Sequence, residues 1–186
     1  EAASGNPKGE AAAALAARVN EELDGRACME VTANATDHDE STMLAGLQHG
    51  AFDMAAGETG LLGAVSPRFL VFDLPFLFDD IEAVLAFQAS DTGADLLEAT
   101  RSAGIVGLGF WLDGFEHMTA DRAIAAPGDL EGLSVWVRDS ELKRAYIETI
   151  GAEPVTMPLT EVADALAEGE IDAQGSSWST IATQGF

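Results

Sequence analysis

The chain has 186 residues, a length that fits one or two small α/β domains, and its 47% hydrophobic content is ample for a packed core. Thirty-two acidic residues against nine basic ones give a formal charge of −23, so the surface repels phosphate backbones and anionic membranes. The composition argues against nucleic-acid binding, and because no apolar run is long enough to span a bilayer, no direct membrane insertion is expected.

The chain begins with signals for a helix. Asn6 can cap the helix and Pro7 suits its first position, where a backbone N–H would have no partner. The Ala-rich run continues to Leu23. Residues 26–33 then alternate like a strand, in which the lone Cys28 is expected to be buried.

A short pattern occurs twice, as LQHGAFDMA at residues 47–55 and as LAEGEIDAQ at residues 166–174. In each copy an amphipathic helical run leads to a glycine, which ends the helix because it accepts a left-handed backbone. A short strand and a polar turn are expected to follow. The repetition suggests two related α/β lobes, each presenting a turn beyond the carboxyl end of its strand, where such sheets hold their ligands.

Between the two copies, residues 69–78 are too apolar for a surface loop and Pro75 excludes a long helix, which predicts an extended, buried crossing segment. The remaining pattern alternates strands with helices and indicates a mainly parallel sheet in each lobe. Strands are expected at residues 104–111, 115–119, 133–137 and 153–157, with a hairpin at 113–114, and helices at 80–88, 92–102 and 140–150.

Several short motifs recur in an order typical of one protein family. They are DLPFLFD at 73–79, LEGL at 130–133, GAEP at 151–154, MP at 157–158, EV at 161–162 and GEIDAQ at 169–174. In this order and spacing the chain resembles the dicarboxylate-binding type of solute-binding proteins of TRAP (tripartite ATP-independent periplasmic) transporters. The resemblance covers nearly the whole chain.

The resemblance implies an α/β, two-lobed periplasmic binding-protein fold of the type II-like class, with the C-terminal part missing. Lobe 1 would comprise residues 1–111, with a crossing segment near 112–116, and lobe 2 would comprise residues 117–186, truncated at its C-terminal end. The family implies a periplasmic receptor, not an enzyme, that needs no cofactor. Its partners would be a small organic solute and the permease subunits in the membrane.

Some positions that contact the ligand in the family differ in this chain. Trp136 stands where the family carries an Arg that holds the ligand's carboxylate, and Ser176 replaces an Asn that also touches the ligand. Glu116 stands where some members have a second Arg. Glu40 and Glu58 match acidic or polar pocket positions of some members.

Arg138 is the candidate replacement for the missing anchor. It lies two residues beyond Trp136, and because strand side chains alternate, both should point to the same face, about 6.6 Å apart along the strand. The alternative is an ordinary ion pair with Asp139 or Glu141. For the tryptophans the alternatives are core packing and contact with a ligand. The predicted ligand-binding residues are Glu40, Glu58, Glu116, Trp136, Arg138, Leu159, Ser176 and Trp178.

No metal ligand is predicted, since His38, His49 and His117 lack metal-ligand spacing. No catalytic residue is predicted either, since Ser176 and Ser177 have no His near them in the sequence. The solute remains open between a carboxylate or zwitterion held by Arg138 and a cationic solute, such as a betaine or an amine, held by glutamates and tryptophans. The rival function is a ligand-binding sensor or enzyme domain on the same two-lobed scaffold.

Overall fold

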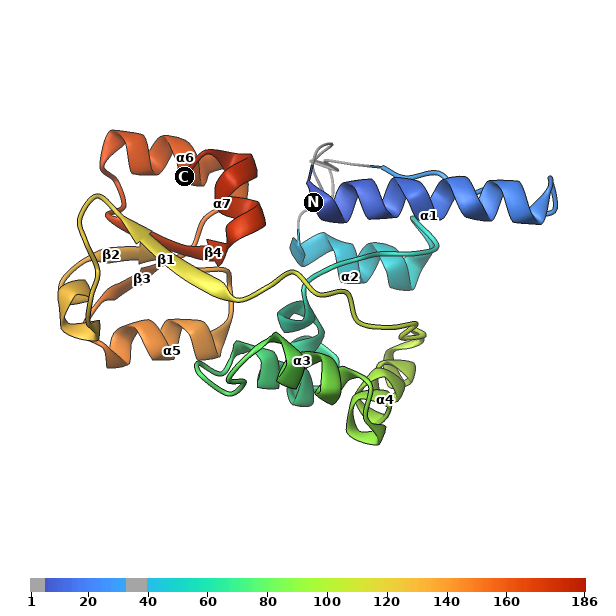
Figure 1. Ribbon diagram of the computed structural model, residues 1–186, viewed down its shortest axis with the longest axis horizontal. Helices are drawn as coiled ribbons and strands as arrows, with labels where there is room; N and C mark the ends of the chain where they lie inside the picture. Colours follow the sequence, from blue (N-terminus) through green and yellow to red (C-terminus); the bar gives the residue numbers. More distant parts are fainter. Residues whose placement is uncertain (1–5, 33–39) are drawn as a thin grey trace.

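The computed structural model describes residues 6–32 and 40–186, which form a helical part and a part built on a sheet (Figure 1). The helical part contains α1 (Pro7–Leu23), α2 (Glu40–His49), η1 (Thr59–Ala64), η2 (Pro67–Asp73), α3 (Ile81–Gln88), α4 (Asp91–Glu98) and η3 (Ala99–Ala103). The second part contains β1 (Glu116–Ala120), η4 (Pro127–Leu130), β2 (Ser134–Trp136), α5 (Glu141–Thr149), β3 (Glu153–Val155), α6 (Leu159–Glu168), β4 (Ala173–Ser177) and α7 (Trp178–Gln184).

The second part is a three-layered α/β unit. Its sheet has the strand order β1-β4-β2-β3, with β1 antiparallel to β4 and the other pairs parallel. Val135 faces α5, where it packs with Ile147, whereas Trp136 faces α6, where it packs with Val162. Figure 1 shows α6 above the sheet and α5 below it. The expected α/β class is therefore confirmed, and the alternation of β2 separates the two cores.

The helix ends follow the local chemistry expected from the sequence. The Asn6 carboxamide oxygen accepts the Lys8 N–H at 2.9 Å, which caps α1, and the Asp80 carboxylate accepts the Ala83 N–H at 2.8 Å, which caps α3. Helix α1 ends at Asp24, whose φ of 41° is left-handed. These ends depend only on neighbours in sequence, so they could be predicted.

The two copies of the repeated pattern share the helix and its end but not the strand. Gly50 and Gly169 both follow a helix with φ of 73°, as expected. Only the second copy continues into a strand, β4. In the first copy, Phe52 turns back over α2, where a β-carbon on Gly46 would lie 2.7 Å from its ring. The strand expected after Gly50 is therefore wrong.

The strand expected at residues 26–33 is absent over its described residues, 26–32. The reason is that a side chain takes the place of a partner strand: the Asn20 amide accepts the Met29 N–H at 2.7 Å and donates to the Met29 carbonyl at 3.0 Å. Cys28 is exposed there, which corrects the expected burial.

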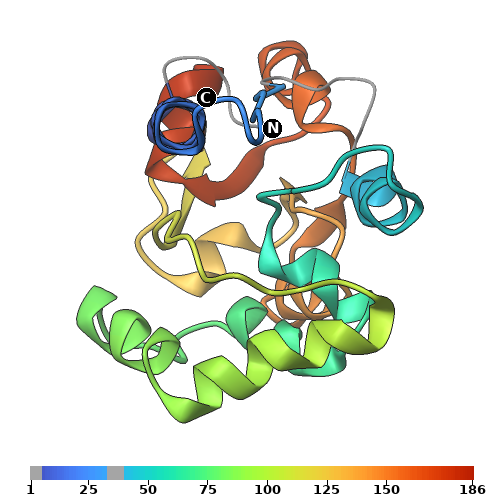
Figure 2. The same cartoon turned by 90° about the vertical axis from the view of Figure 1, so that its right-hand side faces the viewer.

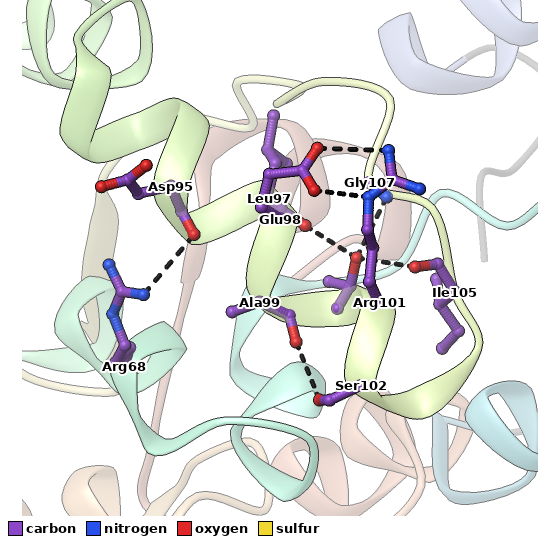
Figure 3. A network of polar contacts seen from close by, with 10 residues as sticks. Arg68, Asp95, Leu97, Glu98, Ala99, Arg101, Ser102, Ile105 and Gly107 are labelled. Atoms are coloured by element: carbon purple, nitrogen blue, oxygen red, sulfur yellow. Dashed lines mark hydrogen bonds and ion pairs between the residues drawn. The ribbon is translucent and has the colours of Figure 1, made fainter.

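Residues 104–111 form no strand either, because the hydroxyl of Thr100 binds the backbone that a strand would use. Its oxygen accepts the Gly107 N–H at 3.0 Å and lies within 3.0 Å of the Ile105 carbonyl. Figure 3 shows this turn after η3, with Arg101 paired to Glu98 beside it. Strand β1 consequently pairs with β4 instead of forming the expected hairpin.

The apolar stretch 69–78 is not extended. Its first half is the 3-10 helix η2, in which Phe69 is fully buried, and Phe76 beyond it is 90% exposed. Phe72 of η2 packs at ring-centroid distances of 5.6 Å against Phe87 and Phe110. This aromatic contact fixes the segment that leads from the helical part to β1.

The arrangement of the two parts is the same in both views. Helices α6 and α7 lie at the top, and α3 and α4 lie at the bottom (Figures 1 and 2). Helix α5 packs against η2, which brings the sheet part and the helical part into contact. Among the described residues, no helix combines the length and apolar character that crossing a bilayer requires.

We expect Asp172→Ala to destabilise the protein by about 1–2 kcal/mol, because Asp172 fixes β4 beside β2. Its Oδ2 accepts the Ser134 N–H at 2.9 Å and the Ser134 hydroxyl at 2.7 Å, and these bonds lower the pKa of Asp172. A lowered carboxyl pKa stabilises the fold above the unfolded-state value of 3.8 and loses that effect as pH falls through the native value. Urea unfolding should therefore show a deficit at neutral pH that shrinks in acid.

The matched control for this prediction is Asp164→Ala, since Asp164 is exposed on α6. It should change the free energy of unfolding by less than about 0.5 kcal/mol. Equal effects of the two substitutions would contradict a specific role for Asp172.

Candidate functional site

A cleft lies where the helical part meets the residues that follow β2 and begin α5. Its lining residues are Glu58, Gly60, Leu61, Asp73, Arg138, Asp139, Ser140 and Lys143. Glu58 precedes η1 and Asp73 ends η2, so one wall comes from the helical part and the other from the sheet part. A position beyond the carboxyl end of a parallel strand is where α/β sheets present ligand sites.

An ion pair between Glu58 and Arg138 crosses the cleft. The distance from Arg138 Nε to Glu58 Oε1 is 2.7 Å, and the two side chains are 13% and 29% exposed, respectively. Burial raises the pKa of Glu58, while the charges of Arg138 and Lys143 act in the opposite direction. Arg138 Cζ lies 5.8 Å from the centroid of the Trp136 ring, as expected for side chains on one face of a strand.

A second ion pair joins Lys143 of α5 to Glu116 of β1, with Nζ and Oε2 2.5 Å apart. Burial lowers the pKa of Lys143, but the charges of Glu116, Glu58 and Asp73 outweigh burial and raise it. Gly175 on the neighbouring strand makes this contact possible, because a β-carbon there would lie 2.6 Å from Glu116 Oε1. The ammonium is thus held at the cleft by acids on several elements.

A hydrogen bond also links the two walls. The Ser140 hydroxyl donates to Asp73 Oδ2 at 2.7 Å, and Ser140 is 8% exposed at the start of α5. Gly60 leaves room for this carboxylate, since a β-carbon there would lie 3.0 Å from Asp73 Oδ2. Asp139, which also lines the cleft, forms an ion pair with Arg144 of α5.

Two buried polar atoms lie on the face of β4 shared with Trp136. Ser176 is 4% exposed and Gln174 is fully buried, and neither the Ser176 hydroxyl nor the Gln174 Oε1 has a hydrogen-bond partner among the described residues. Gln174 pairs with Trp136 of β2, and Ser176 pairs with His117 of β1. An unpaired buried hydroxyl is costly, which suits a group that binds a ligand.

Trp136 and Leu159 lie in the core between the sheet and α6. Trp136 is 1% exposed and its indole N–H donates to the Met157 carbonyl at 3.0 Å. The partly buried Leu159 packs against the same cluster. The Trp136 ring thus lies against the Arg138 guanidinium. A direct contact between Trp136 and the ligand stays a prediction.

Trp178 lies at the start of α7 and is 62% exposed. Its ring is 4.6 Å from that of His117 and tilted by 31°. Glu40 is the first residue of α2, and its side chain lies outside the described residues. Trp178 is not among the residues that line the cleft.

Of the residues predicted from the sequence, the structure brings Glu58 and Arg138 into direct contact and places Glu116 behind Lys143. Sequence reasoning missed Lys143, Asp73 and Ser140. Ser140 and Lys143 follow a parallel strand at the start of a helix, a position that could have marked them. Asp73 belongs to the DLPFLFD motif, but no local sequence pattern indicated that this residue lines the cleft.

Among the described residues, no group of three or more His, Cys, Asp or Glu side chains is arranged to hold a metal ion. The acids of the cleft are instead occupied by guanidinium, ammonium and hydroxyl groups. What the arrangement offers chemically is paired charges and hydrogen-bond donors for a small polar solute.

Comparison with known families identifies this architecture. The model of the family "Bacterial extracellular solute-binding protein, family 7" matches residues 1–186. The chain belongs to this family. The C4-dicarboxylate-binding periplasmic protein DctP of Vibrio cholerae is 39% identical to the chain over 181 residues, covering 97% of the chain and 54% of the relative.

Solved structures of TRAP periplasmic solute-binding proteins are also similar. A TRAP periplasmic solute-binding protein from Shewanella oneidensis with bound succinate matches 100% of the chain and 61% of its own, with 33% identity and a TM-score of 0.94. One from Pseudomonas aeruginosa with bound L-malate matches 100% and 65%, with 30% identity and a TM-score of 0.93. The chain spans about half the length of the curated relatives it matches.

Proposed function

We propose that this chain belongs to a periplasmic receptor that captures a small organic solute with a carboxylate and delivers it to the permease of a TRAP transporter. The observation that carries the proposal is the placement of Arg138 and Lys143 in a cleft between two walls. Charge-assisted hydrogen bonds from such groups are the usual means of holding a carboxylate. The relatives bound to succinate and L-malate support the same class of solute.

Capture would use both walls of the cleft. In the two-lobed arrangement, residues 1–111 form lobe 1, residues near 112–116 form the crossing segment and residues 117–186 belong to lobe 2. Glu58 and Asp73 come from the first lobe and Arg138, Ser140 and Lys143 from the second, so a solute that touches both would favour the closed state. The relative and the family are named for solute binding, which suits a receptor better than an enzyme.

A panel of compounds tests this function in thermal and calorimetric titrations of the purified protein. Carboxylates of two to six carbons and sugar acids should stabilise it, with a ligand at a hundredfold excess over its Kd adding about 2.7 kcal/mol. Neutral polyols of the same size are the control and should have no effect. Stabilisation by polyols alone, or by no carboxylate, would contradict the proposal.

A further inference from the structure

The guanidinium proposed to hold the solute is already bound to a carboxylate of the protein itself. Glu58 Oε1 lies 2.7 Å from Arg138 Nε, and the side chains of Arg138 and Glu58 are only 13% and 29% exposed. A carboxylate that binds a guanidinium along its side uses the Nε donor together with a terminal nitrogen. Glu58 therefore occupies a donor that a solute carboxylate needs in this geometry.

The cleft around the ion pair leaves little room for a solute. Its free volume is about 10 Å³, which is room for roughly one water molecule. Two contacts join its walls, namely the ion pair of Glu58 with Arg138 and the hydrogen bond from the Ser140 hydroxyl to Asp73. A solute of several carbon and oxygen atoms can enter only if the walls separate, and their separation breaks the contact of Glu58 with Arg138.

We infer that Glu58 is an internal competitor for Arg138, which a solute carboxylate displaces when it binds. The inference rests on the proposed function and deepens it, because it names the residue that limits how tightly this cleft holds a carboxylate. Displacement replaces one guanidinium–carboxylate contact by another and leaves Glu58 without its partner in a mostly buried position. A buried carboxylate without a partner is unfavourable, so its presence weakens solute binding.

The other charges near Glu58 do not replace Arg138 as its partner. Lys143 attracts Glu58 but forms an ion pair of its own, and the effects of Lys8 and Asp113 on Glu58 are opposite in sign. Burial is the largest influence and raises the pKa of Glu58, so a displaced Glu58 takes up a proton more readily than an exposed glutamate does. The charged groups that act on Glu58 or line the cleft with it are Lys8, Asp73, Asp113, Arg138, Asp139 and Lys143.

Calorimetric titration of the wild type and of Glu58→Gln with succinate and L-malate, the acids bound in the two similar structures, tests the inference. We expect Glu58→Gln to bind the acids about tenfold more tightly, because a neutral amide of similar size competes weakly for a guanidinium. In the Arg138→Ala background the same substitution should give no gain, since the competition acts through Arg138. An equal gain in both backgrounds would reveal a general effect of charge and would overturn the inference.

A second measurement needs only the wild-type protein and decides the matter if Glu58→Gln does not fold. Protonation of Glu58 releases Arg138, so the affinity for a carboxylate should rise as pH falls from about 8 to about 5, after correction for the ionisation of the solute. An affinity that stays constant over this range overturns the inference.

Glu22→Gln is the matched control. Glu22 also forms an ion pair with an arginine, Arg18, at 2.8 Å, but this pair is exposed on α1 and does not line the cleft. Its removal should leave the affinity for both acids unchanged. Equal or weaker binding by folded Glu58→Gln overturns the inference and leaves the proposed function intact. Failure of the wild type to bind any carboxylate overturns both.

Discussion

Replacing Arg138 with Ala is expected to weaken carboxylate binding by about a hundredfold and to destabilise the protein by about 2–3 kcal/mol at neutral pH. The first effect follows because Arg138 lines the cleft, where its guanidinium is the charged donor best suited to hold a carboxylate. The second follows because Glu58, 29% exposed, would lose the partner that lies 2.7 Å away. Calorimetric titration and urea unfolding measure the two effects separately.

The loss of stability should depend on pH in a direction set by Glu58. Burial raises its pKa above 4.5, so the native protein binds this proton more tightly than the unfolded chain does. Stability therefore falls as pH rises from about 4.5 towards the native value. Without Arg138 the native pKa of Glu58 rises further. The deficit of Arg138→Ala should thus be small near pH 4 and grow towards neutral pH.

Two variants make this prediction specific. Glu58→Gln in the Arg138→Ala background removes the unpaired charge, so it should restore stability without restoring binding. Arg18→Ala breaks an ion pair with Glu22 in which the Arg18 side chain is 78% exposed. This substitution should alter the free energy of unfolding by less than about 0.5 kcal/mol. Unchanged carboxylate affinity in Arg138→Ala would mean that another group is the anchor.

The sequence predicted the features that depend on residues close together in the chain, and it missed those that depend on distant residues. The cap at Asn6 and the left-handed ends at Gly50 and Gly169 depend on a few adjacent residues, and all were predicted. The prediction of a strand at residues 104–111 was wrong, because the alternation of apolar and polar residues indicates which side chains face a core. It does not indicate whether a partner strand is available. Thr100 takes the backbone groups of that segment instead, as Figure 3 shows around Ile105 and Gly107.

The same limit applies to the candidate site. Glu58 and Arg138 were predicted individually, from family positions and from strand alternation. Their pairing depends on how η1 is set against the end of β2, which no local pattern contains. The contact of Lys143 with Glu116 was missed for the same reason, since Gly175 permits it from a third element. The sequence therefore indicated some of the residues that line the site, whereas their ion-pair partners depend on tertiary packing.

Trp136 poses the sharpest choice between core packing and ligand contact. Its ring is 1% exposed among Val162, Ala165 and Ile171, so we expect Trp136→Ala to destabilise the protein by about 3–5 kcal/mol. Trp136→Phe keeps most of the packing but leaves the Met157 carbonyl without its indole donor, at a cost of about 1–2 kcal/mol. Denaturant unfolding at fixed pH gives both values.

Trp178→Ala is the matched control, because that ring is 62% exposed and its removal should cost less than about 1 kcal/mol. Binding measured in Trp136→Phe, which should stay folded, then separates the two roles. If Trp136 only packs against Arg138, the solute affinity of Trp136→Phe should fall by no more than about tenfold. The reason is that Phe still presents an aromatic face to the guanidinium. A loss of affinity as large as that of Arg138→Ala, with stability unchanged, would instead place Trp136 in contact with the solute.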